Sequence, residues 1–394
     1  MLRILSRVVV VFVLSFAFSL DVYAGERNSG PWNLDELKQT PAATFGERDG
    51  LVQPVWYAGE PFENHATRVF AWYARPEGAG PFPAMVLVHG GGGKAFREWA
   101  EHWAKRGYAA IAMDLAGNGP NGRLPDAGPD QSDELKFRDF SPETVRDMWS
   151  YHAVADVLRA HSLLAAQPEV DRDRIGVTGI SWGGYLTCIV AGIDDRLKVA
   201  VPVYGCGHLA DNSVWVEPRF SKMTEAHRDR WVTTFDPSKY LPGVSCPILF
   251  LNGTNDFAYP LDSYRKCYRL VDAPRTLSVI PRLPHGHIWT FKEVDAFVDT
   301  AFKKGPALPT LTELQLDSGI ATAKVVAESP IKQVALHYTT DGGPWQTREW
   351  KSVPAELKEG VISAKLPEGK GLVFYLAAID ERGLFVSTNY LERE

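Results

Sequence analysis

The sequence is poor in cysteine, has no surplus of basic residues and has no apolar run long enough to cross a membrane. Its 394 residues include 4 cysteines, too few for a disulfide scaffold in a chain of this length. Acidic residues (48) outnumber lysine and arginine (42), and the net charge of −6 is spread over interspersed signs. This pattern excludes nucleic acids and anionic membrane surfaces as expected partners.

The N-terminus has the features of an export signal. Arg3 and Arg7 precede an uncharged apolar run at residues 8–20, and Val22, Tyr23 and Ala24 form a small-residue cleavage pattern. The run is shorter than the roughly 20 residues that span a bilayer, and no cysteine follows Ala24 to carry a lipid. We predict that residues 1–24 are a cleaved signal peptide and that the mature protein is periplasmic or secreted. After cleavage, no association with the membrane is expected.

Strand and helix patterns alternate over residues 25–304. Residues 52–57 and 67–74 predict an antiparallel opening, and the buried apolar runs at 84–88, 109–114, 175–178 and 199–203 predict parallel strands. Helices are expected at 96–105 and 146–167 between them. This order predicts an α/β fold with a doubly wound, mostly parallel sheet, whose site lies at the carboxyl ends of the strands.

One strand runs into a glycine-flanked serine. Gly179 and Gly183 stand two residues before and two after Ser181, directly after the apolar run 175–178. A nucleophile elbow needs these residue types, because the serine adopts a strained backbone and small neighbours let strand and helix approach closely. A bare Gly-x-Ser-x-Gly match is only moderately specific, so the rest of the chain must supply a base and an acid.

Candidates for the acid and the base follow in the order that the elbow requires. Asp256 closes a turn-rich loop after the strand predicted at 247–251. His285 and His287 follow the strand predicted at 276–280 and precede a helix predicted at 290–302. Two histidines with one residue between them also suit a metal, but zinc needs three or four ligands and the sequence shows no compact cluster of others.

In combination, these motifs resemble the α/β-hydrolase superfamily over about residues 50–304. The likeness is closest to the branch of acetyl xylan esterases, dienelactone hydrolases and prolyl-oligopeptidase-type catalytic domains. It implies Ser181 as nucleophile, Asp256 as orienting acid and His287 as general base, with His285 as the alternative base. Dienelactone hydrolases carry cysteine at the elbow, so the serine here does not imply their reaction. The resemblance implies no metal and no organic cofactor.

Residues 89–93, a histidine followed by four glycines, come directly after the strand at 84–88. This segment, here called the glycine loop, resembles the His-Gly-Gly-Gly loop of esterases. Acyl transfer needs two backbone N–H groups aimed at the oxyanion. The resemblance implies Trp182, the residue after the nucleophile, and either Gly91 or Gly92. A phosphate-binding loop is excluded by spacing, since Val88 stands where its first glycine belongs. His89 is expected to order this loop.

The C-terminal composition differs from that of the preceding part. After a linker at residues 305–309, short β-rich runs separated by glycine turns predict a small all-β sandwich of immunoglobulin or fibronectin type at residues 310–394. Trp345 and Trp350 are either packing residues, the favoured interpretation, or exposed platforms for carbohydrate.

The combined interpretation is an exported serine hydrolase that cleaves carboxylic esters through an acyl-enzyme. The expected substrate is a small-molecule or polysaccharide ester, with deacetylation of carbohydrate favoured. The alternatives are a serine peptidase of prolyl-oligopeptidase type and a catalytically silent binding protein on the same scaffold. Insertions at 115–141 and 204–240 are expected to cap the acyl pocket. The sequence leaves open the oligomeric state and a Cys246–Cys267 disulfide.

Overall fold

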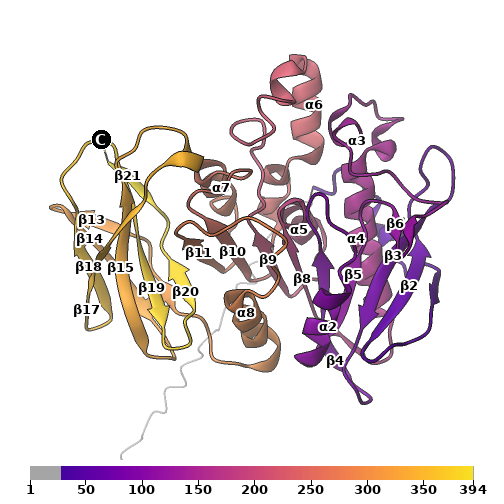
Figure 1. The fold of residues 1–394 in the computed structure, drawn as a ribbon, viewed down its shortest axis with the longest axis horizontal. Coiled ribbons are helices and arrows are strands. Elements are labelled where there is room, and N and C mark those ends of the chain that lie inside the picture. The colour runs from indigo at the N-terminus through magenta and orange to yellow at the C-terminus, as the bar shows by residue number, and fades with distance from the viewer. Residues whose placement is uncertain (1–27, 394) are drawn as a thin grey trace, which may run out of the picture.

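The computed structural model describes residues 28–393, so the predicted signal peptide lies outside the described residues. Two parts lie side by side (Figure 1). The first, here called the sheet domain, ends with helix α8 (Lys292–Lys303), and the second, here called the β domain, begins with strand β12 (Thr310–Leu311). No helix among the described residues is both long and apolar enough to span a bilayer.

A nine-stranded sheet forms the centre of the sheet domain. Its strands, in spatial order, are β1 (Ala43–Phe45), β2 (Val52–Ala58), β3 (Arg68–Ala74), β5 (Ala109–Met113), β4 (Phe82–Val88), β8 (Val170–Ile180), β9 (Val199–Val203), β10 (Ile248–Gly253) and β11 (Arg275–Ile280). The pairs β1–β2, β2–β3 and β3–β5 are antiparallel, and every pair from β5 to β11 is parallel. This confirms the predicted antiparallel opening and parallel core.

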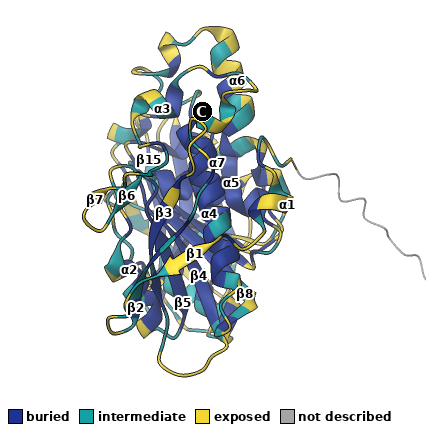
Figure 2. Ribbon diagram, turned by 90° about the vertical axis from the view of Figure 1, so that its right-hand side faces the viewer, coloured by how far each residue is buried: buried dark blue, intermediate teal, exposed yellow. Residues whose placement is uncertain are grey.

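Helices cover both faces of the sheet. The helices besides α8 are α1 (Leu34–Leu37), α2 (Arg97–Lys105), α3 (Asp133–Phe137), α4 (Trp149–Ala165), α5 (Trp182–Ile193), α6 (Glu225–Phe235) and α7 (Leu261–Tyr268). α4, α5 and α7 pack into one apolar core and α2 and α8 into another, on the opposite face. The central strands, α4 and α5 are almost wholly buried, whereas α3 and α6 expose much of their surface (Figure 2). Both faces are covered because parallel strands are apolar on both sides.

The β domain consists of two antiparallel sheets with a shared apolar core. One contains β12, β13 (Gln315–Asp317), β14 (Ile320–Val326), β17 (Glu356–Lys358) and β18 (Val361–Lys365). The other contains β15 (Ile331–Thr339), β16 (Lys351–Pro354), β19 (Leu372–Asp380), β20 (Phe385–Ser387) and β21 (Leu391–Arg393). Inward side chains such as Ala323, Ile362 and Leu376 join the α2–α8 core. The predicted sandwich is confirmed, while its immunoglobulin or fibronectin type stays a prediction.

The β domain contacts the last strand of the large sheet. Ser278 donates a hydrogen bond to the Phe385 carbonyl (2.8 Å), and Tyr375 donates one to the Val279 carbonyl (2.9 Å). Trp345 and Trp350 are buried in an apolar cluster that also contains Val279. The expectation that these tryptophans serve packing is therefore confirmed, and neither is an exposed carbohydrate platform.

All four cysteines are buried, and Cys188, Cys206 and Cys267 are free thiols. Cys188 and Cys206 are packed in the core, and the disulfide left open between Cys246 and Cys267 is not formed. Because burial raises the pKa of the Cys188 and Cys206 thiols well above the ordinary range, both stay protonated and poorly reactive.

Stability is expected to fall on mild acidification because of a buried histidine in the β domain. Burial lowers the pKa of His337 to about 4 from its ordinary 6.5. Between these values the unfolded chain binds a proton that the folded protein excludes, so stability present above pH 6.5 is lost as the pH falls towards 4. The expected loss at pH 5 is up to about 2 kcal/mol.

Urea unfolding at pH 7 and pH 5 measures this loss. His152, whose pKa burial also lowers to about 4, adds a similar term in the sheet domain. The variant His337→Gln carries no titrating ring and should lose less stability between the two pH values than wild type. An identical pH dependence in both proteins would show that His337 does not contribute.

Candidate active site

Ser181 forms the sharp corner between β8 and α5. Its backbone has φ 55° and ψ −120°, a conformation that L residues rarely adopt. A Cβ atom on Gly179 would lie 2.3 Å from the Gly183 carbonyl oxygen, and one on Gly183 would lie 2.0 Å from the Val88 carbonyl oxygen. Both glycines are therefore required by close backbone approach, as the elbow pattern predicts.

Gly183→Ala is expected to destabilise the protein by about 3 kcal/mol, because the added methyl overlaps backbone that cannot move without shifting β4. Gly342→Ala is the matched control, since nothing lies within 4 Å of its Cβ position. Thermal unfolding of the two variants beside wild type measures the difference. Equal melting temperatures for all three proteins would contradict this account of the elbow.

Asp256 is a buried acid at the carboxyl end of β10, with a side chain that is 1% exposed. Its Oδ1 accepts hydrogen bonds from the backbone N–H groups of Ala258 (2.9 Å) and Tyr259 (2.7 Å). Its Oδ2 lies 2.7 Å from His285 Nδ1. The two amides fix the orientation of the carboxylate. Its Oδ2 is therefore held in position to orient the His285 ring.

His285 is the histidine that meets this acid. Its ring packs on Tyr204 and Phe257, with centroids 4.4 and 4.8 Å away. The Tyr204 hydroxyl donates to the Gly286 carbonyl (2.5 Å) and holds the loop that carries the ring. With Nδ1 donating to Asp256, Nε2 is left as the basic nitrogen.

The expected pairing of Asp256 with His287 is wrong: the hydrogen bond to Asp256 is made by His285. His287 lies against the glycine loop instead, where its ring packs on Phe96 at 5.2 Å and bonds to the Gly90 backbone. Partial burial and the neighbouring His285 lower the pKa of His287. The physical reason is geometric, since residues two apart in an irregular loop point to different partners and only one ring reaches the carboxylate.

The glycine loop lies between the serine and His287. A Cβ on Gly90 would lie 2.9 Å from Ser181 Cβ and 3.6 Å from His287 Nε2. His89 orders the loop as expected, because its Nδ1 bonds the Gly90 carbonyl (2.7 Å) and its Nε2 accepts from the Leu115 amide (2.9 Å).

Of the expected oxyanion donors, Gly92 is already engaged by a side chain. Its N–H donates to Gln131 Oε1 at 3.0 Å. Gly91 packs on the Trp182 ring, since a Cβ there would lie 2.8 Å from Trp182 Cδ1. The geometry therefore favours Gly91 over Gly92 as the partner of the Trp182 amide.

Comparison with known proteins bears on the fold and the family. The acetyl xylan esterase (AXE1) family matches residues 51–217, and the PhoPQ-activated pathogenicity-related protein family matches residues 213–343. The structure of an acetyl xylan esterase from Paenibacillus sp. R4 superposes with a TM-score of 0.56 at 21% identity, over 68% of this chain and 92% of that one. The chain has the α/β-hydrolase fold and resembles the acetyl xylan esterases.

Two curated relatives bear on the choice between an esterase and a peptidase. Acetyl esterase Axe7A of Xylanibacter ruminicola is 23% identical over 294 residues, which is 67% of this chain and 63% of that protein. The acylamino-acid-releasing enzyme of Sus scrofa is 25% identical over 303 residues, 70% of this chain and 38% of that protein. The chain thus spans less than two thirds of the length of either relative.

The two insertions of this α/β-hydrolase fold pack on one another above Trp182. In Figure 1 their helices α3 and α6 stand at the same end of the molecule. Phe137 of the first stacks on Trp231 of the second at 5.5 Å, and the Trp231 indole donates to the Lys136 carbonyl (2.8 Å). Together they form a cap, whose side chains enclose the Trp182 ring beside the nucleophile.

Lys136 is a buried cation in this cap that sequence reasoning missed. Its Nζ lies 5.0 Å from the Trp182 ring centroid and 5.1 Å from that of Trp149, and it donates to the Gln131 carbonyl (2.6 Å). Burial lowers the pKa of Lys136 to about 8. The burial of Lys136 could not be predicted from the sequence, because the lysine stands in a polar, glycine-rich segment and is buried only when the cap folds.

Asp114, directly before the first insertion, and Asp126, within it, make different contacts. Asp114 is buried and accepts from the backbone N–H groups of Ala116 (2.9 Å) and Asn118 (2.7 Å), while Asp126 pairs with Arg68. Asp114 therefore holds the turn that follows β5, whereas the Asp126 side chain forms an ion pair. Within residues 28–393, no group of three or more histidine, cysteine, aspartate or glutamate side chains is placed to hold a metal ion.

Proposed function

We propose that this protein is an exported serine hydrolase that removes acyl groups, with acetyl favoured, from carbohydrate esters. The observation that carries the proposal is the Asp256–His285 hydrogen bond, at the same edge of the sheet as the strained Ser181. The likeness to acetyl esterase Axe7A and to the acetyl xylan esterase family supports an ester substrate. Export rests on the N-terminal sequence alone.

In the proposed mechanism, His285 Nε2 takes the Ser181 hydroxyl proton as Oγ bonds to the ester carbonyl carbon. The carbonyl electron pair moves onto oxygen, where the Trp182 and Gly91 amides receive it. Collapse of this tetrahedral species breaks the bond to the alcohol, which leaves with the proton from His285. Water then repeats the sequence on the acyl-enzyme and releases the carboxylic acid. Asp256 keeps Nδ1 protonated and stabilises the imidazolium.

A serine peptidase is the second candidate, favoured by the likeness to the acylamino-acid-releasing enzyme. The same acyl-enzyme chemistry cleaves amides when the leaving amine is protonated. A catalytically silent binding protein is the third candidate.

A substrate panel separates the three candidates. Mature protein and Ser181→Ala are assayed on p-nitrophenyl acetate, longer p-nitrophenyl esters, acetylated xylan and a proline-type peptide anilide. Serine-dependent release from short esters and acetylated xylan is the expected result. Cleavage of the anilide alone would favour the peptidase. Inactivity on the whole panel, together with no labelling of Ser181 by a fluorophosphonate, would favour the binding protein.

A further inference from the structure

A cavity of about 410 Å³ lies between the two domains, directly beside the acid–histidine pair. The sheet domain contributes its acid loop and its histidine loop, and the β domain contributes one short loop. The lining residues are Asn255, Asp256, Phe257, Arg282, Leu283, Pro284, His285, Gln346, Thr347 and Arg348. A ligand in this cavity touches His285, so the β domain supplies part of the wall next to the proposed base.

The β-domain loop at residues 346–348 is held in a fixed position relative to Asp256. The Asn255 side-chain amide, next to Asp256 in the chain, donates to the carbonyl oxygens of Gln346 (3.2 Å) and Arg348 (2.8 Å). It also lies 3.4 Å from the Trp345 carbonyl oxygen. The Asn255 amide thus contacts several carbonyls of the β-domain loop. These contacts position the loop relative to Asp256, in addition to the packing of the β domain on β11.

Two guanidinium groups line the cavity, and among the described residues neither forms an ion pair within 4.0 Å. The carboxylates of Glu392, Asp262 and Asp341 act on Arg348 from a greater distance. Arg348 lies over the Trp345 ring, 3.7 Å from its centroid, and its Nε donates to the Gly343 carbonyl (2.9 Å). These contacts fix the side chain and engage one of its five N–H groups. Arg282 is exposed at the cavity wall. An arginine fork without an ion-pair partner is suited to bidentate recognition of a carboxylate.

An exposed aromatic ring completes the cavity. Phe257 is 54% exposed, an unusual position for phenylalanine beside a buried acid. One edge of its ring contacts His285, at 4.8 Å between centroids. An aromatic ring at a cavity wall offers an apolar surface on which a sugar ring can pack, and Gln346 and Thr347 offer hydrogen-bonding groups for hydroxyls.

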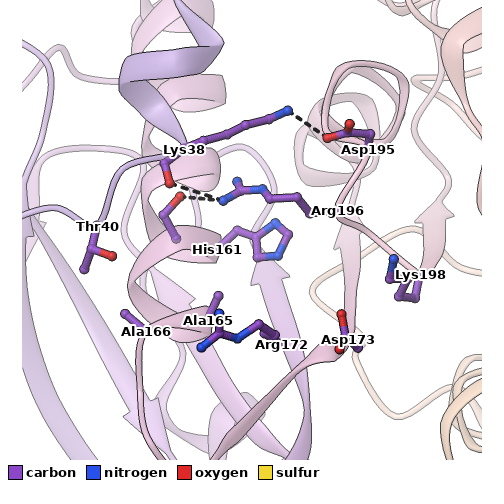
Figure 3. A pocket seen from close by; sticks show the side chains of 11 residues that line it. Lys38, Thr40, His161, Ala165, Ala166, Arg172, Asp173, Asp195, Arg196 and Lys198 are labelled. Atoms are coloured by element: carbon purple, nitrogen blue, oxygen red, sulfur yellow. Dashed lines mark hydrogen bonds and ion pairs between the residues drawn. The ribbon is translucent and has the colours of Figure 1, made fainter.

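A second cavity is larger than the interdomain cavity and has different lining residues. It measures about 580 Å³ and lies at the amino ends of β8 and β9, away from the elbow. There Lys38 is paired with Asp195 (Figure 3). Arg196 is paired with Asp194. Arg172 lines this remote cavity and supplies a control for loss of one positive charge.

We infer that the interdomain cavity binds a carboxylate-bearing sugar unit of the ester substrate. Arg282 and Arg348 bind the carboxylate, and Phe257 packs on the sugar ring. The inference rests on the proposed esterase function and narrows its substrate to acidic carbohydrate esters. No bond forms or breaks at this subsite, which acts by positioning the ester for Ser181.

The first test compares two substrates. Acetylated xylo-oligosaccharides with and without a glucuronic acid branch are hydrolysed by wild type and by the Arg282→Gln/Arg348→Gln variant. The double variant is expected to lose about 10-fold or more in kcat/KM on the acidic substrate and less than about 2-fold on the neutral one. Arg172→Gln should match wild type on both substrates. An equal loss on both substrates in the double variant would overturn the inference.

Two further measurements keep the test decisive. Arg282→Gln alone changes an exposed side chain and should reduce activity on the acidic substrate about 3-fold or more even if the double variant folds poorly. Binding of deacetylated acidic and neutral oligosaccharides to Ser181→Ala, followed by NMR titration, needs no turnover. Preference for the acidic ligand supports the subsite even if the panel shows no esterase. Equal binding overturns it, and serine-dependent cleavage of neutral esters would then leave the proposed function standing.

Discussion

Ser181→Ala is expected to lower kcat on p-nitrophenyl acetate by about 10³-fold or more without lowering the melting temperature. Loss of the hydroxyl removes the atom that bonds to the acyl carbon, and only the activity supplied by the oxyanion donors and by substrate binding remains. The fold should survive because alanine has the Cβ that serine already places in the elbow, so the strained backbone is unchanged. Steady-state kinetics and thermal unfolding measure the two effects.

Labelling provides the control for this result. A fluorophosphonate should attach to wild type at the peptide that contains Ser181 and should not attach to the alanine variant. Ser221→Ala, which removes a hydroxyl bonded to the Glu217 carbonyl in the cap, should label and turn over as wild type. Full activity in correctly folded Ser181→Ala would refute the proposed nucleophile.

His285→Ala is expected to cost about 10³-fold or more in kcat, and His287→Ala about 10-fold or less. The difference follows from the Asp256 carboxylate, which fixes the tautomer of His285 and stabilises its charged form, whereas His287 meets a backbone group and Phe96. Parallel kinetics of the two single variants on one ester measure the difference.

A double variant tests whether the histidine acts together with the acid. Because Asp256 acts through His285, the pair Asp256→Asn and His285→Ala should cost little more together than His285→Ala alone. Asp256→Asn with His287→Ala should instead combine nearly additively. If His287→Ala were the inactive variant and His285→Ala the active one, the base assignment would revert to His287.

The parallel strands were predictable because they are buried on both faces. Strands β4, β5 and β9 and the second half of β8 are short apolar runs, a pattern that local sequence shows directly. The charged first half of β8, residues 170–174, does not show this pattern. The elbow was predictable for a related reason: close approach at Gly179 and Gly183 leaves no room for a side chain, so the constraint is visible as residue type.

Other features depend on contacts that local sequence does not show. β13 and β17 are short strands of exposed residues, whose polar composition resembles that of loops. The choice between His285 and His287 depends on which ring reaches a carboxylate 29 residues away along the chain. Likewise, Asn255 holds Arg348 next to the acid loop by binding carbonyls 90 or more residues away in sequence.

The position of the β domain against β11 also bears on solubility. β11 is the last strand of the nine-stranded sheet, and a bare edge strand exposes backbone groups that template pairing with other chains. Here Ser387 accepts from the Val279 amide and Tyr375 donates to the Val279 carbonyl, so side chains of the β domain occupy that edge. In a sheet domain expressed alone, this strand would be uncovered, and the protein should self-associate. The β domain, which also forms part of the cavity wall, is therefore expected to prevent aggregation.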